Sequence, residues 1–254
     1  MKIDGNTILI TGGGSGIGEA LAHRFHDLGN TVIIAGRRLS ALERAADGRA
    51  NMHTMQLDVE SEESISDFAK RLLDEYPKVN ILLNNAGIMR FEALAERRDL
   101  NDAEATVTTN LLGPIRLTNA LIDHFVRQSD AAIINVSSGL AFVPLSVAPT
   151  YSATKAAMHS YTIAMREALK GRVEVIELAP PAVQTAIMPG QESRPGFLPL
   201  DEFADEVMEL FAKQPTPSEI LVKGVHFQRF AEAEGRFEGA LQALHERVVK
   251  AGGD

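Results

Sequence analysis

Cysteine is absent from this chain of 254 residues, and that absence excludes several kinds of chemistry. Without a thiol there is no disulfide, no thiolate ligand for a metal ion and no cysteine nucleophile. The seven histidines lack the spacing from one another and from carboxylates that metal sites show. We therefore expect packing or surface roles for them and no metal site.

Long apolar runs and an excess of positive charge are also missing. No run approaches the ~18 residues that a membrane span needs. The first residues, MKIDGNTILIT, lack the basic region, apolar stretch and cleavage site of a signal peptide. The net charge of −9 argues against general affinity for nucleic acid, because phosphate binding needs a basic face. We expect a cytoplasmic protein that binds neither membrane nor nucleic acid, while a local basic pocket for a phosphate stays open.

Short apolar segments alternate with amphipathic ones along the chain. Several are apolar at every position, as expected for strands buried on both faces of a parallel sheet. This alternation predicts an α/β fold of the Rossmann type, a doubly wound, mainly parallel sheet of about seven strands with helices on both faces. The expected strands are Thr7–Thr11, Thr31–Ala35, Met52–Leu57, Ile81–Asn84, Ala131–Val136, Val173–Leu178 and Glu219–Val222.

No linker, repeat or low-complexity tract divides the chain, so residues 1–254 are expected to form a single domain. The segment Met188–Leu200 contains three prolines and two glycines, which is too irregular for a core element. A mobile substrate loop is therefore expected near residues 186–200. Beyond Val225 the chain is polar and helix-prone, which predicts a helical C-terminal extension over residues 225–254.

A glycine-rich turn, Thr11–Gly18 (TGGGSGIG), follows the first expected strand. Glycines let the backbone turn tightly and approach a pyrophosphate, and the N-terminus of the next helix offers N–H groups and a positive dipole end. A merely flexible turn is the alternative, but a strand before it and a helix after it favour a dinucleotide site. The residues expected to contact the dinucleotide here are Gly12, Gly14, Ser15, Gly16, Ile17 and Gly18.

Tyr151 and Lys155 lie four residues apart in a helix-prone segment, which places phenol and ammonium on one helix face. An ordinary phenol, with a pKa near ~10, is a poor base at neutral pH. A neighbouring ammonium and an oxidised nicotinamide would both lower that pKa and make the phenol a general acid/base. An isolated pair at this spacing also occurs by chance in many helices.

Two serines supply the context for this pair. Ser137 and Ser138 end a buried strand, and Ser138 precedes Tyr151 by thirteen residues. Open α/β sheets bind ligands at the carboxyl edges of their strands. Ser138 is therefore expected to hydrogen-bond the substrate oxygen and to hold it against the Tyr151 hydroxyl. Ser137 is the competitor for this role, and we expect it to turn into the fold.

Taken together, these motifs resemble the short-chain dehydrogenase/reductase family over nearly the full chain. The shared motifs are TGGGSGIG, Leu57-Asp58-Val59, Asn84–Gly87, Asn110, Val136–Ser138, YSATK and Pro180–Thr185. More narrowly, GNTILITGG, TNLLGPIRLT, INVSSGLAFVP and VEVIELAPPAV resemble the subgroup named for D-alanine esterification of teichoic acids. The resemblance implies an oxidoreductase that moves hydride between a nicotinamide dinucleotide and a carbonyl or alcohol.

The resemblance also implies roles for individual residues. Ser138 would polarise the substrate oxygen, Tyr151 would be the acid/base, and Lys155 would hold the ribose hydroxyls and lower the pKa of Tyr151. Asn110 would position a water that links Lys155 to solvent. The other implied dinucleotide contacts are Asp58 and Val59 at the adenine, Asn85, Ala86 and Gly87 along the adenosine and ribose, and Pro181, Val183 and Thr185 at the nicotinamide. Taken alone, Asn84–Gly87 could be only a turn and Asp58 only a helix cap.

Pro181 departs from the family, which usually has glycine at this position. Proline cannot take a positive φ and donates no N–H, so the nicotinamide contact there is expected to differ.

The choice of dinucleotide depends on the end of the second strand. NAD-preferring relatives usually carry an Asp where Gly36 stands, and Arg37 and Arg38 follow it here. Two arginines could grip a ribose phosphate, although they could also simply face solvent. Ser15 is not the basic residue that some NADP enzymes have there. We expect NADP(H) to be preferred, with NAD(H) possible.

Apolar residues follow Ser138 and recur in the expected loop, which suits a mostly apolar ketone, aldehyde or alcohol. Arg90 and Arg194 keep an acidic substrate open. The expected substrate contacts are Ser138, Leu140, Phe142, Tyr151, Ile187 and Met188, and further apolar walls are Val143, Leu145, Phe197 and Leu198.

These observations predict one function, with one alternative, and a homo-oligomeric assembly. The first function is an NADP(H)-dependent alcohol dehydrogenase or carbonyl reductase. The alternative is a dinucleotide-binding regulatory protein on the same fold, although such proteins often lose the Tyr or the Lys that this chain keeps. The resemblance implies a homodimer or homotetramer that uses the helices at about Ala103–Gln128 and Ser152–Leu169. The second of these carries small residues that permit close approach, although that stripe could instead pack on its own sheet.

Overall fold

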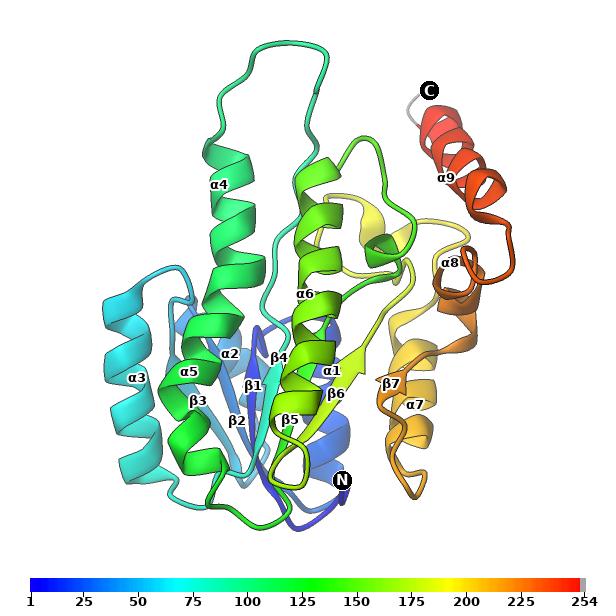
Figure 1. Cartoon of the computed structure of the whole chain (residues 1–254). Helices are drawn as coiled ribbons and strands as arrows, with labels where there is room; N and C mark the ends of the chain where they lie inside the picture. The colour runs from blue at the N-terminus through cyan, green and yellow to red at the C-terminus, as the bar shows by residue number, and fades with distance from the viewer. Residues whose placement is uncertain (252–254) are drawn as a thin grey trace.

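The computed structural model describes residues 1–251, with side chains described up to residue 246. The last three residues of the predicted C-terminal extension therefore lie outside the described part. Seven strands form one parallel sheet in the order β3-β2-β1-β4-β5-β6-β7, which confirms the predicted Rossmann-type sheet (Figure 1). The strands are β1 (Thr7–Thr11), β2 (Thr31–Gly36), β3 (Met52–Gln56), β4 (Ile81–Asn84), β5 (Ala132–Val136), β6 (Glu174–Leu178) and β7 (Glu219–Ile220).

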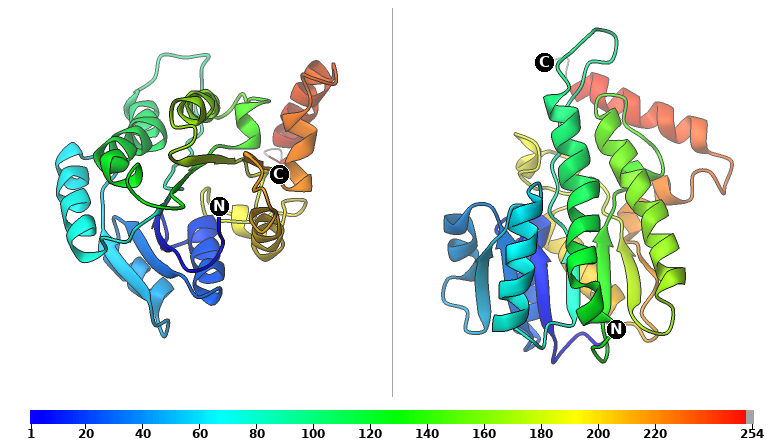
Figure 2. Two further views of the ribbon diagram at one scale, coloured as in Figure 1. Left: turned by 60° about the horizontal axis from the view of Figure 1, so that its bottom comes forward. Right: turned by 60° about the vertical axis from the view of Figure 1, so that its left-hand side comes forward.

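Helices cover both faces of the sheet, as the two views of Figure 2 show. Helices α3, α5 and α6 pack on one face, and α1, α2 and α7 pack on the other. The α-helices are α1 (Gly16–Asp27), α2 (Leu39–Ala46), α3 (Glu62–Glu75), α4 (Asn101–Val107), α5 (Gly113–Phe125), α6 (Pro149–Ala168), α7 (Leu200–Phe211), α8 (His226–Arg229) and α9 (Phe237–Ala251). Short turns complete the described elements: the π-helical η1 (Thr108–Leu112) and the 3₁₀ turns η2 (Gly139–Ala141), η3 (Gln191–Ser193) and η4 (Lys223–Val225).

The apolar strands supply two cores, because successive side chains of a strand point to opposite faces. In β1, Ile8 and Ile10 join Phe25 of α1 and Phe203 of α7, whereas Leu9 joins the core under α3, α5 and α6. All these side chains are fully buried. A strand that is apolar throughout therefore needs helices on both faces, which explains why such runs predicted this fold.

Two segments outside the sheet shape its upper edge. The chain after β6 folds back on itself, with a bridge between Val183 and Leu198 and the turn η3 between them. Beyond β7, α9 places Ala240 against Ala231 and the buried Val143, so this helix packs on the segment that follows β5. Within residues 1–251, no helix is both long and apolar enough to cross a membrane.

Candidate active site

The glycine-rich turn between β1 and α1 has no room for side chains at Gly12, Gly13 and Gly18. A Cβ on Gly18 would lie 2.4 Å from the carbonyl oxygen of Gly12, and a Cβ on Gly12 would lie 3.0 Å from Cα of Ala86. Ser15 caps α1 with extended backbone, and its side chain makes no hydrogen bond to the first helical turn. The backbone N–H groups of the first turn of α1 therefore stay available to another acceptor. A narrow turn with such free donors at a helix N-terminus fits the pyrophosphate of a dinucleotide.

The segment after β4 holds this turn in place. The backbone N–H groups of Asn85 and Ala86 both donate to Oγ1 of Thr11 at 3.0 Å, and Nδ2 of Asn85 donates to the Thr11 carbonyl at 2.9 Å. The Asn85 side chain thus supports the cradle from below. A Cβ on Gly87 would lie 3.7 Å from Nζ of Lys155, so the same segment also reaches Lys155.

Tyr151 lies in the first turn of α6 and is 8% exposed. Burial raises its pKa to about 12, and a hydrogen bond with the Ser138 side chain opposes that rise. Ser138 begins the turn η2 directly after β5, and its Oγ also accepts the N–H of Leu140 at 3.1 Å. The end of β5 and the start of α6 therefore bring Ser138 and Tyr151 together.

Lys155 lies one helical turn after Tyr151 and is 4% exposed. Its Nζ donates to the carbonyl of Val136 at 2.8 Å and lies 5.6 Å from the centre of the Tyr151 ring. Burial lowers the pKa of Lys155 to about 8. Burial dominates the pKa of Tyr151 here, and the lowering expected from this ammonium together with a bound oxidised nicotinamide stays a prediction.

Asn110 lies in the π-helical turn between α4 and α5, and it is 1% exposed. Its Oδ1 accepts the N–H of Ile88 and its Nδ2 donates to the Ile88 carbonyl, both at 2.8 Å. A weaker bond of 3.4 Å runs to Oγ1 of Thr154, the residue before Lys155. Single π turns inside helices often mark functional positions, and this one aims an amide at the main chain beside the catalytic pair.

Tyr151 belongs to a small apolar cluster. Met89 and Ala148 are buried in it, and Leu140, Leu145, Ile187 and Met188 pack against it partly exposed. Met89 was not among the expected substrate contacts, although an apolar residue shortly after Asn84–Gly87 was a usable signal. These side chains form the wall against which a substrate of Tyr151 would lie.

Phe142 does not pack in this cluster, and its expected substrate contact stays a prediction. Its ring packs edge-on against His159 of α6 at 4.9 Å, and the guanidinium of Arg229 lies 4.9 Å from its centre on another side. Val143 likewise faces Ala231 and Ala240. The 3₁₀ turn η2 directs Leu140 toward Tyr151 and the following residues toward the C-terminal helices.

The end of β2 carries the residues expected to choose between dinucleotides. A Cβ on Gly36 would meet only the far end of Leu42, at 3.7 Å, so packing does not forbid an Asp there. Arg37 is 57% exposed and pairs with Glu60 at 3.1 Å, while the exposed Arg38 begins α2. Both guanidinium groups lie at the carboxyl edge of the sheet.

The remaining predicted contacts have mixed surroundings. Asp58 accepts the N–H of Glu60 at 3.0 Å, as a capping carboxylate does, and the buried Val59 packs where α5 begins. Thr185 lies beside the glycine-rich turn, since a Cβ added to Gly16 would lie 3.5 Å from the Cβ of Thr185. Pro181 packs on Gly224, while Val183 is buried beside Leu198.

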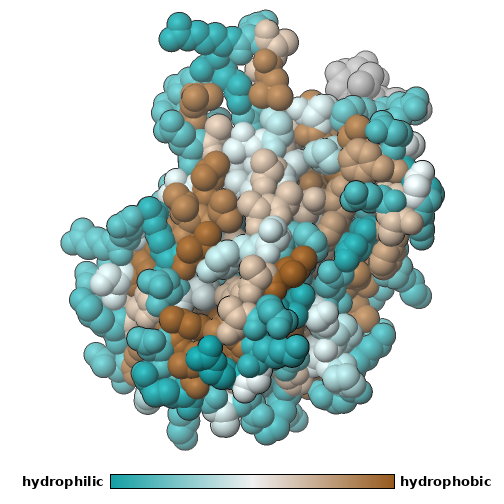
Figure 3. All heavy atoms as spheres, viewed as in Figure 1, coloured by the Kyte–Doolittle hydropathy of each residue, from teal (hydrophilic) through white to brown (hydrophobic). Residues whose placement is uncertain are grey.

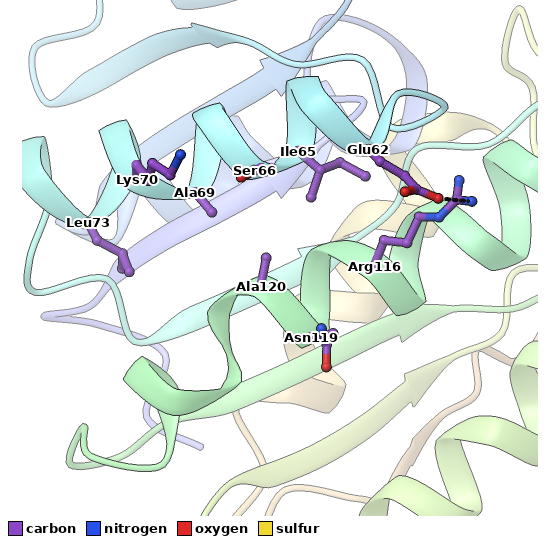
Figure 4. Close-up of a pocket in the computed structure, with 9 residues that line it drawn as sticks. All are labelled: Glu62, Ile65, Ser66, Ala69, Lys70, Leu73, Arg116, Asn119 and Ala120. Carbon is purple, nitrogen blue, oxygen red and sulfur yellow. Dashed lines mark ion pairs between the residues drawn. The ribbon is translucent and has the colours of Figure 1, made fainter.

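A separate open groove runs along the outer surface between α3 and α5 (Figure 4). Ile65, Ala69 and Leu73 form its apolar part, and an ion pair of 2.6 Å between Arg116 and Glu62 lies at one end. None of the predicted site residues lines it. The groove therefore belongs to the helical surface and not to the catalytic edge of the sheet.

Comparison with known proteins gives consistent matches. A family model described as short chain dehydrogenase matches residues 6–195. The uncharacterized oxidoreductase DltE of Bacillus subtilis is 40% identical over 215 residues, which are 83% of this chain and 84% of that protein. The NADP-dependent 3-hydroxy acid dehydrogenase YdfG of Shigella flexneri is 32% identical over 175 residues, 68% of this chain and 71% of that protein.

Solved structures resemble the fold closely. The 3-ketoacyl-(acyl-carrier-protein) reductase from Brucella melitensis complexed with NADH gives a TM-score of 0.77 at 28% identity, covering 86% of this chain and 96% of that chain. A serine dehydrogenase complexed with NADP⁺ gives 0.75 at 26% identity, covering 84% and 92%.

Proposed function

This chain belongs to the short-chain dehydrogenase/reductase family, and we propose that it uses NADP(H) to interconvert a ketone or aldehyde and the corresponding alcohol. It is an oxidoreductase of that class, and its cofactor is a nicotinamide dinucleotide. The observation that carries the proposal is the placement of three residues: Ser138 follows β5, and Tyr151 and the buried Lys155 follow each other in the first turns of α6, with Tyr151 packed in an apolar cluster.

The proposed chemistry assigns one task to each side chain. When bound, the dinucleotide supplies or accepts the hydride. Ser138 holds the substrate oxygen, and the Tyr151 hydroxyl exchanges a proton with it. With a pKa raised to about 12, Tyr151 is protonated at neutral pH, which suits the acid that carbonyl reduction requires. Lys155 donates to the ribose hydroxyls, and Asn110 orders the main chain next to it.

The apolar wall around Tyr151 favours a mostly apolar substrate. Arg90 is already engaged, since its Nη1 donates to the Met89 carbonyl at 3.0 Å and its Nε lies 3.6 Å from Asp102. Neutral carbonyl compounds are therefore the first class to test. Acidic ones belong in the same screen, because relatives carry the names sulfoacetaldehyde reductase and 3-hydroxy acid dehydrogenase.

The preference for NADP(H) rests on the end of β2. Gly36 supplies no carboxylate for the ribose hydroxyls, although the surrounding space would accept one. Arg37 and Arg38 are exposed beside it, where a ribose phosphate would accept their N–H groups. The exposed ion pair of Arg37 with Glu60 is weak enough to exchange for such a phosphate.

A homo-oligomer is also proposed. Ala153, Ala156, Ser160 and Ala164 of α6 are all exposed, so this stripe of small residues is directed away from the sheet. Figure 3 shows hydrophobic residues gathered on the face that α4, α5 and α6 form. Exposed Leu112 and Ile163 add to that face. A second copy that packs its own helices here would bury them in a symmetric interface.

The test is a carbonyl and alcohol panel followed by absorbance of the reduced dinucleotide, run with each of the two dinucleotides. Tyr151→Phe should abolish turnover and leave dinucleotide affinity nearly unchanged, because it removes one proton donor and little volume. A loss of less than about tenfold, with chemistry shown to limit the rate, would contradict the acid/base role. Dinucleotide binding without turnover of any compound would favour the regulatory alternative.

A further inference from the structure

Glu177, on β6, is a carboxylate with no exposed surface, and the proposed reaction does not use it. Its register partners are Asn135 on β5 and Glu219 on β7, so it belongs to a polar row across neighbouring strands. A buried carboxylate is costly unless hydrogen bonds and opposite charges compensate it. The partners of Glu177 therefore indicate its role.

Both oxygens of Glu177 are engaged. Oε1 accepts the hydroxyl of Ser137, and Oε2 lies 2.7 Å from Nδ1 of His159, a partly exposed residue of α6. The backbone N–H of Ser137 also donates to the carbonyl of Leu178 at 2.9 Å. Ser137 is thus fixed to β6 through its side chain and its main chain, and Ser138 is the next residue.

His159 also contacts the other end of the turn η2, at Phe142. The His159 ring packs edge-on against Phe142 at 4.9 Å, and Arg229 of α8 lies 4.9 Å from Phe142 as well. Between the two ends, the N–H of Gly139 donates to the Pro180 carbonyl at 2.8 Å. The segment from Ser137 to Phe142 is therefore anchored at both ends by contacts that meet at His159.

A metal site is the alternative use of this cluster, since ligand atoms of His159, Glu177 and Glu219 all lie within 4.8 Å of one another. However, Arg229 donates to both oxygens of Glu219, at 2.9 and 3.0 Å. The oxygens of Glu177 are taken by Ser137 and His159. A cation would have to displace a bidentate guanidinium, which favours a hydrogen-bonded network over a metal centre.

We propose that Glu177 and His159 are positioning residues for Ser138: the His159–Glu177 pair fixes Ser137 and thereby aims the Ser138 hydroxyl at the substrate oxygen. This inference rests on the proposed function, which gives Ser138 that contact. Orientation matters at such a site, because misplacing a reacting group by about 1 Å can cost roughly a hundredfold in rate. The glycine-rich turn at the end of β1 is separated from β6 by β4 and β5, so dinucleotide affinity is expected to depend little on the pair.

Two substitutions of the histidine separate its two contacts. His159→Phe keeps a ring against Phe142 and removes the donor to Glu177. His159→Asn keeps an N–H at the place of Nδ1 and removes the ring. We expect His159→Phe to lower kcat/KM for the carbonyl substrate at least about tenfold, while the dinucleotide Kd stays within about twofold. His159→Asn should restore kcat/KM to within about threefold of the wild type.

Ser137→Ala should reproduce the effect of His159→Phe, and the double variant should lose little more, because both changes break one chain of contacts. The matched control is His124→Phe. His124 is a histidine of α5 whose Nε2 lies 2.8 Å from the Val79 carbonyl, at the opposite edge of the sheet. This control should leave kcat/KM unchanged, even where it lowers thermal stability.

Hydrogen exchange of the Gly139 and Leu140 amides gives a readout that needs no turnover. Exchange there should accelerate in His159→Phe and stay unchanged in His124→Phe. The inference is overturned if exchange does not change, if His159→Asn loses as much activity as His159→Phe, or if dinucleotide affinity falls as far as kcat/KM. A wild type that converts no carbonyl or alcohol would refute the proposed function, and the exchange result would still decide this inference.

Discussion

Replacing Lys155 by Met should stabilise the protein while it abolishes turnover. Lys155 is 4% exposed, and burial lowers its pKa from 10.5 to about 8. That difference corresponds to roughly 3 kcal/mol of cost for burying the charge, at about 1.36 kcal/mol per pKa unit. The variant also loses the hydrogen bond to the Val136 carbonyl, which destabilises it by about 1 kcal/mol. The net gain of about 2 kcal/mol should raise Tm by roughly 4–8 °C in a chain of this size.

The gain should depend on pH with a defined sign. The folded pKa of Lys155, about 8, lies below the value of 10.5 for the unfolded chain. Between these two values the unfolded chain binds more protons, so wild-type stability rises with pH there. The penalty is complete below the folded pKa and absent above the unfolded one. The Tm advantage of Lys155→Met should therefore be largest near neutrality and shrink as the pH approaches 10.

Differential scanning calorimetry of the protein without dinucleotide, at several pH values from neutrality to 10, measures this directly. Lys170→Met is the matched control, because the Lys170 side chain is 78% exposed just beyond α6 and carries no burial cost. A variant less stable than the wild type at neutral pH, or a Tm difference that does not change with pH, would refute the reasoning. Added NADP⁺ should stabilise the wild type more than Lys155→Met, since Lys155 is proposed to hold the ribose.

The remaining predictions concern the dinucleotide and the assembly. Gly18→Ala should abolish dinucleotide binding measured by calorimetry, because its Cβ would lie 2.4 Å from the Gly12 carbonyl oxygen. Unchanged affinity would mean that the glycine-rich turn does not bind the dinucleotide. Arg37→Ala should weaken NADPH binding by about 1.5–3 kcal/mol and NADH binding far less; equal losses would mean that Arg37 does not read the phosphate. Light scattering at micromolar concentration should show a dimer or tetramer that Ile163→Lys, at a position 46% exposed, dissociates. A monomeric wild type would exclude the assembly, and a dimer through residues 225–249 would refute the interface.

The fold was predictable because its determinants are local. Strands such as β1 and β2 have continuous apolar centres, and Gly29 follows the end of α1, so element type and order could be predicted from the pattern alone. The parallel arrangement then followed from the strand–helix alternation. The same topology places the ends of β1, β4 and β5 at one edge. For that reason the glycine-rich turn, Ser138 and Tyr151 could be assigned to one site before their distances were known.

Side-chain direction in irregular segments could not be predicted in this way. Leu140 and Phe142 are two residues apart in an apolar run, yet the 3₁₀ turn between them sends one to Tyr151 and the other to His159. Periodicity applies to regular helices and strands and gives no orientation for such a turn. The raised pKa of Tyr151 could not be predicted for a related reason. Spacing placed Lys155 on the same helix face, but it did not reveal that Nζ bonds to Val136 or that burial outweighs its charge.

The two buried charges near Ser138 differ in a way that separates support from chemistry. Glu177 has partners on both oxygens, from Ser137 and His159, so both of its acceptors are used within the protein. Lys155 has three N–H donors, and the bond to Val136 uses one of them. A charged group whose hydrogen-bonding atoms are all paired within the protein is not stabilised further by a ligand. A group with free N–H donors is stabilised when ribose hydroxyls accept hydrogen bonds from them. The free donors of Lys155 therefore fit its proposed contact with the ribose, and the occupied oxygens of Glu177 fit its proposed positioning role.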